Sequence, residues 1–199
     1  MADEVEYDQL CDVLYSEEKR WNETGHAFTV DLKDSVAWLP PFLGLMWLTG
    51  GRVSEVLCVR GSDIKITEEG SIQVVTVTLP NLKQRRNAEK KCLFIPSQYP
   101  VVWSYIENYI VHLENPTGLL FHRSRKTVYA HCKRIWGFGP HKAGRHSWMM
   151  NQARRGMSLL DAKQLGGWKS LTSMGAYISE FGQKELTQRM LKLPPGGTK

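Results

Sequence analysis

The sequence predicts a mainly α-helical fold with one small antiparallel β-sheet, that is, an α+β protein. Apolar side chains recur at helical spacing along most of the chain. Alternating β-branched residues are clearest at Ile72–Leu79, which predicts a strand, and Cys92–Ile95 is its expected partner. The polar, basic segment Pro80–Lys91 between them is expected to be a long hairpin loop. A length of 199 residues is enough for one domain with a sizeable core.

The expected helices are distributed along the whole chain. The first has an acidic first turn, which suits the positive end of a helix. The second is strongly apolar over Val36–Leu48, but this stretch is short and is interrupted by Pro40-Pro41, which we expect to distort the helix. We therefore expect a buried helix and not a membrane span. In chain order, the expected helices are Asp3–Trp21, Asp31–Thr49, Val53–Arg60, Ser97–Leu113, Lys126–Trp136, Ala143–Arg155, Leu159–Gly166 and Phe181–Leu193, with a short helix or turn at Ser170–Tyr177 before the last of them.

These elements suggest a main domain followed by an appendage. We expect the domain at residues 1–180, with the acidic helix at 3–21 and the core from about residue 30 to residue 180. Residues 181–199 are expected to form a C-terminal helix and a loose tail. That helix carries an apolar stripe, which predicts docking either onto the chain's own core or onto a neighbouring subunit. The stripe consists of Phe181, Leu186, Met190 and Leu193.

The charge of the chain is unevenly distributed. The net charge is +6, yet residues 1–34 hold ten acidic residues and only three Lys or Arg, so the rest is strongly basic. From Asn115 to Leu160 there are nine Lys and Arg residues and no Asp or Glu, with aromatic residues such as Trp136 interspersed. A one-signed segment that can also bury aromatic surface predicts a folded surface for a polyanion, most simply nucleic acid. The alternative is a solvated basic face without a partner.

The composition argues against several other classes of protein. The four cysteines, Cys11, Cys58, Cys92 and Cys132, are isolated, and no Cys/His cluster has the spacing of zinc ligands. We therefore expect no structural metal. No apolar run has the length of a transmembrane helix, and no segment resembles a signal peptide. The expected setting is a reducing, DNA-containing compartment, with no membrane partner.

Two glycines precede Arg52 at the start of an expected helix. A helix N-terminus and a guanidinium together favour a bound phosphate, and Glu55, one turn later, is placed to hold Arg52. A helix cap with an exposed Arg–Glu pair would give the same pattern, and such pairs contribute little to stability. On its own, this segment is compatible with both interpretations.

A second segment, Arg145-His146-Ser147, opens another expected helix. Trp168 follows Arg145 by 23 residues, and Tyr177 follows Trp168 by nine. Taken singly, Trp168 is compatible with ordinary packing and Tyr177 with a core aromatic. Together with Arg52, however, the residue types and both intervals resemble the catalytic domain of the tyrosine recombinases, the phage integrase family, over roughly residues 30–180.

The resemblance implies both a fold and a chemistry. The fold is that of the tyrosine recombinases and type IB topoisomerases. Two arginines hold one DNA phosphate, a tyrosine attacks it to form a 3′-phosphotyrosyl link, and a lysine protonates the departing 5′ oxygen. A 5′ hydroxyl then reverses the step, without a cofactor or metal. The catalytic residues implied for this sequence are Arg52, Lys83, His141, Arg145, Trp168 and Tyr177.

The sequence departs from the family pattern in the second segment. The residue three before Arg145 is usually histidine, but here it is Lys142, and His141 lies four before. Either can fill the role, and we favour His141 because the surrounding glycines and proline allow a one-residue adjustment. Trp168 stands where histidine is more usual. The supporting residues are expected to be Glu55, Lys142 and His146.

The family pattern places the catalytic lysine on the hairpin loop. Lys83 follows the first strand most closely, but Lys90, Lys91 and Arg85 are alternatives because the loop is long. A solvated basic turn would also explain the loop, and its charge favours insertion into a DNA groove in either case. The residues expected to contact DNA are Arg85, Arg86, Lys90, Lys91, Arg123, Arg125, Lys126, Lys133 and Arg134.

The resemblance leaves three functions to compare. A site-specific recombinase or integrase would act on double-stranded DNA as a homotetramer assembled through the C-terminal helix, and would be a monomer when free. A type IB topoisomerase-like enzyme would relax DNA as a monomer, and a DNA-binding protein on the same scaffold would not cleave. For a recombinase, the family implies a phage or mobile element and the cytoplasm, at the nucleoid, of a bacterial or archaeal host. It also implies an N-terminal DNA-clamp domain, which residues 1–31 are too short and acidic to form.

Overall fold

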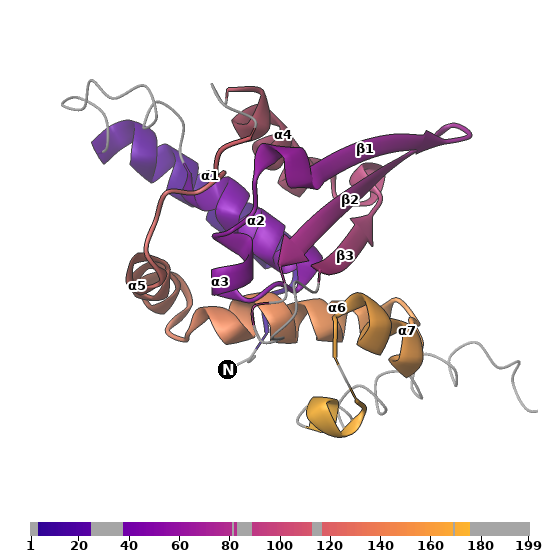
Figure 1. Cartoon of the computed structure of the whole chain (residues 1–199). Helices are drawn as coiled ribbons and strands as arrows, with labels where there is room; N and C mark the ends of the chain where they lie inside the picture. The colour runs from indigo at the N-terminus through magenta and orange to yellow at the C-terminus, as the bar shows by residue number, and fades with distance from the viewer. Residues whose placement is uncertain are drawn as a thin grey trace, which may run out of the picture.

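The computed structural model describes residues 4–24, 38–80, 82, 89–112, 117–168 and 170–175. Most of these residues are helical, and three strands among them form one small sheet (Figure 1). The described elements are α1 (Tyr7–Thr24), α2 (Leu39–Thr49), α3 (Val53–Val56), β1 (Ile64–Glu69), β2 (Ile72–Pro80), β3 (Glu89–Phe94), α4 (Pro100–Val111), α5 (Arg125–Trp136), a π-helical turn η4 (Lys142–His146), α6 (Ser147–Arg154) and α7 (Leu159–Leu165), with short 3₁₀ turns at Gly61–Asp63, Pro96–Gln98 and Thr172–Met174. The expected α+β fold class is confirmed.

Helix α2 is the centre of the main core. All of its residues are buried, and α1 and α4 pack against it. Its sequence is apolar on every side, as expected of a helix that is covered all round. Pro40 and Pro41 lie in its first turn, where a missing N–H breaks no helical bond, so the helix begins at the prolines and is not distorted by them. At its other end α2 delivers the glycine turn that leads to Arg52.

The sheet has the order β1-β2-β3, and both pairings are antiparallel. Val77 of β2 is paired with Ile64 on one side and with Cys92 on the other. Strands β2 and β3 were expected, but β1 was not. Five of the six side chains of β1 are exposed, so the segment lacks the strong apolar alternation of a half-buried strand. Strand β3 begins three residues earlier than expected, which shortens the hairpin loop.

Helix α3 is shorter than the expected helix Val53–Arg60. The chain leaves the helix because the next residues pair with a distant segment. The N–H of Leu120 donates to the carbonyl of Val59 (2.8 Å), and Arg60 forms an antiparallel bridge with Leu119. Hydrogen bonds across the fold thus override the local helical pattern.

The expected helices Asp3–Trp21, Ser97–Leu113, Lys126–Trp136 and Leu159–Gly166 agree with α1, α4, α5 and α7 to within a few residues at each end. Helix α2 begins at Leu39 and not at Asp31, the described part of Ser170–Tyr177 contains a 3₁₀ turn, and Ala143–Arg155 is divided into η4 and α6. The expected C-terminal helix Phe181–Leu193 and its tail lie outside the described residues, as does the domain boundary at residue 180. No described helix is long and apolar enough to cross a membrane.

Candidate active site

Arg52 is held by a buried carboxylate at the start of α3. Gly50 ends α2 in the left-handed region (φ 56), which turns the chain toward Arg52. Glu55 is 2% exposed, and it accepts hydrogen bonds from the backbone N–H of Arg52 (2.8 Å) and from its guanidinium. A buried carboxylate requires such partners, so Glu55 restrains the position of Arg52 more than an exposed carboxylate would. The side chain of Arg52 is 34% exposed and is therefore open to an anion.

Arg145 lies in the π-helical turn η4, in contact with the segment after α7. It is 5% exposed, and its Nη2 donates to the carbonyl of Gly166 (2.6 Å). Gly144 lets the turn approach α2 closely, because a Cβ there would lie 2.7 Å from Cγ of Met46. In place of the expected continuous helix, the structure has a wide turn here, and Arg145 in that turn reaches Gly166. Such π-helical turns are found frequently at functional sites.

The indole of Trp168 covers the guanidinium of Arg145. The guanidinium carbon lies 4.0 Å from the ring centroid, a close cation–π contact. Gly166 makes this contact possible, since a Cβ at that position would lie 1.6 Å from Cζ3 of Trp168. Trp148 of α6 packs against the same indole, with ring centroids 6.3 Å apart. The structure thus brings together an arginine and a tryptophan that the sequence separates by 23 residues.

His141 lies within electrostatic reach of both arginines. Burial lowers the pKa of its imidazole, and the charges of His146, of the two arginines and of Lys142 lower it further. The imidazole is therefore neutral in the free protein at neutral pH. The ammonium of Lys142 lies over the ring of Phe138, 5.9 Å from its centroid.

Lys90 is placed differently from the sequence-based expectation. It was expected in an exposed loop facing DNA, but it lies in β3 and is 7% exposed. Its Nζ donates to the carbonyl of Thr49 (3.2 Å). Its stem packs against Gly167, where a Cβ would lie 2.7 Å from Cδ of Lys90. Burial lowers the pKa of this amine, and the charge of Arg145 acts in the same direction, whereas Cys92 opposes them. The site therefore contains a buried amine.

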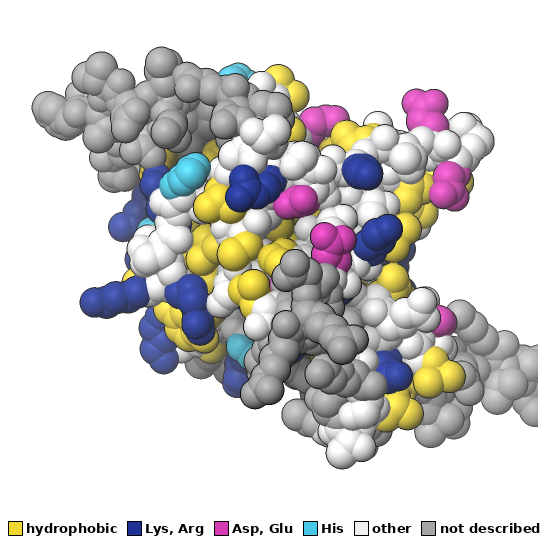
Figure 2. All heavy atoms as spheres, in the orientation of Figure 1, with side chains coloured by type: hydrophobic (Ala, Val, Ile, Leu, Met, Phe, Trp, Pro, Cys, Tyr) yellow, Lys and Arg dark blue, Asp and Glu magenta, His cyan; other side chains and the backbone are white. Residues whose placement is uncertain are grey.

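Most of the described residues that were expected to contact DNA are exposed, and Lys and Arg side chains gather over α5 (Figure 2). The exposed members are Lys91, Arg125, Lys126, Lys133 and Arg134. Arg123 is partly buried, with its guanidinium 5.3 Å from the ring centroid of Trp38. Arg134 donates to Glu17 of α1 (2.8 Å), so the acidic first helix offsets part of this basic surface.

Four of the expected site residues lie outside the described part of the chain. They are Lys83, Arg85, Arg86 and Tyr177. Their roles stay predictions, and so does the expectation that the site uses no metal or cofactor.

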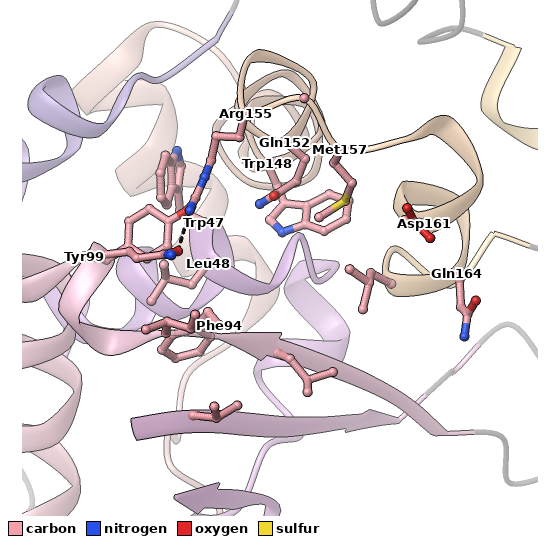
Figure 3. A pocket seen from close by; sticks show the side chains of 16 residues that line it. Trp47, Leu48, Phe94, Tyr99, Trp148, Gln152, Arg155, Met157, Asp161 and Gln164 are labelled. Carbon is pink, nitrogen blue, oxygen red and sulfur yellow. Dashed lines mark hydrogen bonds between the residues drawn. The ribbon is translucent and has the colours of Figure 1, made fainter. Parts of the chain in front are cut away.

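A pocket of about 680 Å³ adjoins the site (Figure 3). Trp148 of α6 lines one side of it, and Phe94 of β3 lines the other. Arg155 lies at one end, with its guanidinium 5.1 Å from the ring centroid of Tyr99. Trp148 also packs against Trp168, so this wall of the pocket supports the indole that covers Arg145.

Comparisons with known proteins identify the fold. No family model and no curated protein matches the sequence. Two solved structures of the XerH site-specific recombinase do match. The post-cleavage complex with a palindromic difH substrate has a TM-score of 0.62 at 16% identity, over 92% of this chain and 52% of that one. The pre-cleavage complex with difH has a TM-score of 0.61 at 17% identity, over 92% and 53%.

The chain thus spans about half the length of these recombinase chains. At such low sequence identity, the likeness is one of fold. The match extends over 92% of this chain. The chain has the fold of a tyrosine recombinase catalytic domain.

Proposed function

We propose that this chain cleaves and rejoins strands of double-stranded DNA through a 3′-phosphotyrosyl intermediate, as a site-specific recombinase. One observation carries the proposal: Arg145 is buried under Trp168, at a site where both arginines act on the imidazole of His141. The solved structures with this fold are recombinases bound to DNA substrates, which supports DNA as the substrate class here.

The site suits the anionic phosphate of a DNA backbone. Arg52 is fixed by Glu55, and its side chain is 34% exposed. Arg145 is fixed by Gly166 and Trp168. Guanidiniums that are already in place stabilise the negative charge that builds on the phosphate oxygens in the transition state, and they need no rearrangement to do so.

The reaction exchanges one phosphodiester bond for another. The phenol oxygen of Tyr177 attacks phosphorus, and the bond to the 5′ oxygen breaks. The phenol proton passes to His141, whose lowered pKa leaves it neutral and able to accept. A lysine gives a proton to the departing 5′ oxygen. The 5′ hydroxyl of a partner strand then reverses the steps, so the bond energy is retained in the covalent link.

Lys90 is the best-supported proton donor in the described part of the chain. Its ammonium is within electrostatic reach of Arg145, and its lowered pKa makes it a stronger acid than an exposed lysine. The hairpin residue Lys83, expected in this role from the sequence, lies outside the described residues. Lys83 and Lys90 are therefore competing candidates for the general acid, and a substrate whose leaving group needs no proton can distinguish them.

Lys90→Met is expected to slow cleavage of ordinary DNA by a factor of about 10²–10⁴, the usual contribution of a positioned acid. It should cleave at a near-normal rate when sulfur replaces the bridging 5′ oxygen, because a thiolate leaves without protonation. Lys91→Met, at the exposed neighbouring position, should weaken DNA binding and leave single-turnover cleavage intact at saturating DNA. If the bridging sulfur rescues Lys83→Met and not Lys90→Met, the assignment belongs to Lys83.

Binding and cleavage are expected to depend on pH in opposite directions. A bound phosphate favours the charged imidazolium of His141, so binding takes up a proton, and DNA affinity should rise as pH falls toward the lowered pKa of the imidazole in the free protein. Cleavage needs the neutral imidazole, so its single-turnover rate should fall over the same range. Fluorescence-anisotropy titrations and quenched reactions, each repeated with His141→Gln, measure both profiles. Unchanged profiles in the variant would exclude His141 from both roles.

The recombinase and topoisomerase interpretations can be separated by the substrate. A topoisomerase-like monomer would relax supercoiled plasmids of any sequence, whereas a recombinase joins two specific sites. Plasmids with two sites and with none therefore distinguish the two. Assembly of a tetramer through residues 181–193, the mobile-element origin and the bacterial or archaeal host stay predictions.

A further inference from the structure

The short segment before α1 is built into the core beside the candidate site. We call residues Glu4–Glu6 the N-terminal strap. Val5 at its centre is 2% exposed. Its N–H donates to Oγ of Ser147 (2.7 Å), and its carbonyl accepts from Nε1 of Trp47 in α2 (2.8 Å). The strap therefore bridges the start of α6 and the central helix, although Val5 and Ser147 are 142 residues apart.

Ser147 passes this attachment on to the turn that carries Arg145. Its hydroxyl donates to the carbonyl of Lys142 (2.7 Å), and its backbone N–H is directed to the same carbonyl. This five-residue closure is what makes η4 a π-helical turn, with Arg145 inside it. One buried hydroxyl thus accepts from the strap and donates to the wide turn.

The strap is also attached at the far end of α6. The guanidinium of Arg154, in the last turn of that helix, pairs with Glu4 and with Oε1 of Glu6 (3.1 Å). The strap therefore binds α6 at both ends. The backbone of Val5 contacts the hydroxyl of the first residue, and the strap's two carboxylates pair with the guanidinium of the last. Because the helix follows directly from η4, an attachment at both ends also restrains the turn.

We propose that the N-terminal strap positions Arg145 by keeping η4 wide, and that Ser147 is the positioning residue through which it acts. A turn that relaxed to an α-helix would shift Arg145 by one residue in register, about 100° around the helix axis. The guanidinium would then leave the Gly166 carbonyl and the Trp168 ring. The consequence for catalysis rests on the function proposed above, but the consequence for the turn does not.

Two variants remove the strap's attachments by different routes. Ser147→Ala deletes the shared hydroxyl, and the double variant Glu4→Gln/Glu6→Gln weakens the pairing with Arg154 while keeping the size of both side chains. The matched control is Glu18→Gln, which removes a carboxylate on α1 that accepts from the Tyr105 hydroxyl (2.8 Å) and lies outside the strap.

Hydrogen exchange of residues 142–147 tests the turn directly. Both strap variants are expected to exchange there at least about tenfold faster than the wild type, and the control is expected not to. Single-turnover cleavage at saturating DNA should slow by a factor of about 100, with the dissociation constant for DNA nearly unchanged.

Unchanged exchange in both strap variants, or equal acceleration in the control, would overturn the proposal. Faster exchange with unaltered cleavage would also overturn it, because Arg145 would then not depend on the turn. If the wild type itself shows no cleavage, the proposed function fails separately and the exchange data alone decide the role of the strap.

Discussion

Arg145→Ala is expected to lower the rate of single-turnover DNA cleavage by a factor of about 10²–10³, or roughly 3 kcal/mol of transition-state stabilisation. The guanidinium is buried, fixed by the Gly166 carbonyl and covered by Trp168. It is therefore organised before the phosphate arrives, and water filling the vacated space would not replace it. Arg52→Ala is expected to have an effect of similar size. The measurement is the rate of strand cleavage at saturating DNA, on a fragment that the wild type cleaves.

Arg155→Ala is the matched control for this prediction. Arg155 has the same charge, follows α6 and also lies over an aromatic ring, that of Tyr99. Its loss should leave the cleavage rate close to that of the wild type. Equal losses in both variants would assign the effect to net charge or to stability. Normal cleavage by Arg145→Ala would contradict the proposal that two arginines hold the phosphate.

Tyr177→Phe is expected to abolish cleavage and to leave DNA binding nearly intact. Only the hydroxyl is lost, and that hydroxyl is the proposed nucleophile. Phenylalanine keeps the ring, so its packing is preserved wherever the ring is buried. Gel-shift titration gives the affinity, and a denaturing gel of the same mixtures gives the cleaved strand.

Tyr129→Phe provides the comparison for the nucleophile. Tyr129 is an exposed tyrosine on the basic helix α5. Its hydroxyl has the same chemistry as that of Tyr177 and is accessible to DNA bound on this helix. This variant should cleave normally. Cleavage by Tyr177→Phe, or loss of cleavage in both variants, would contradict the assignment of Tyr177.

Much of the fold could be predicted from the sequence because its signals are local. The apolar run of α2 predicted a buried helix, and the alternation of β2 predicted a strand. The interval from Arg145 to Trp168 predicted their association, which the structure explains through Gly166: without a Cβ it allows the indole to cover the guanidinium. Tyr177 and Lys83 lie outside the described residues, so their assignment rests on the sequence alone.

The features that could not be predicted depend on contacts between distant segments. Strand β1 is held by its pairing with β2 and buries little apolar surface of its own. The π-helical turn depends on Ser147, which is held from the other end of the chain by Val5. Lys90 did leave a signal that the sequence analysis missed. Continuing the inward alternation of β3 back from Cys92 by two residues places Lys90 in the interior.

The most direct test of the proposed function is to identify the residue that becomes linked to DNA. The chain is mixed with nicked, sheared DNA from its source genome and denatured in SDS, and DNA-linked peptides are identified by mass spectrometry. The proposed function predicts DNA on the peptide that contains Tyr177, and no adduct with Tyr177→Phe. An adduct on a different residue, or DNA binding without any adduct, would contradict it.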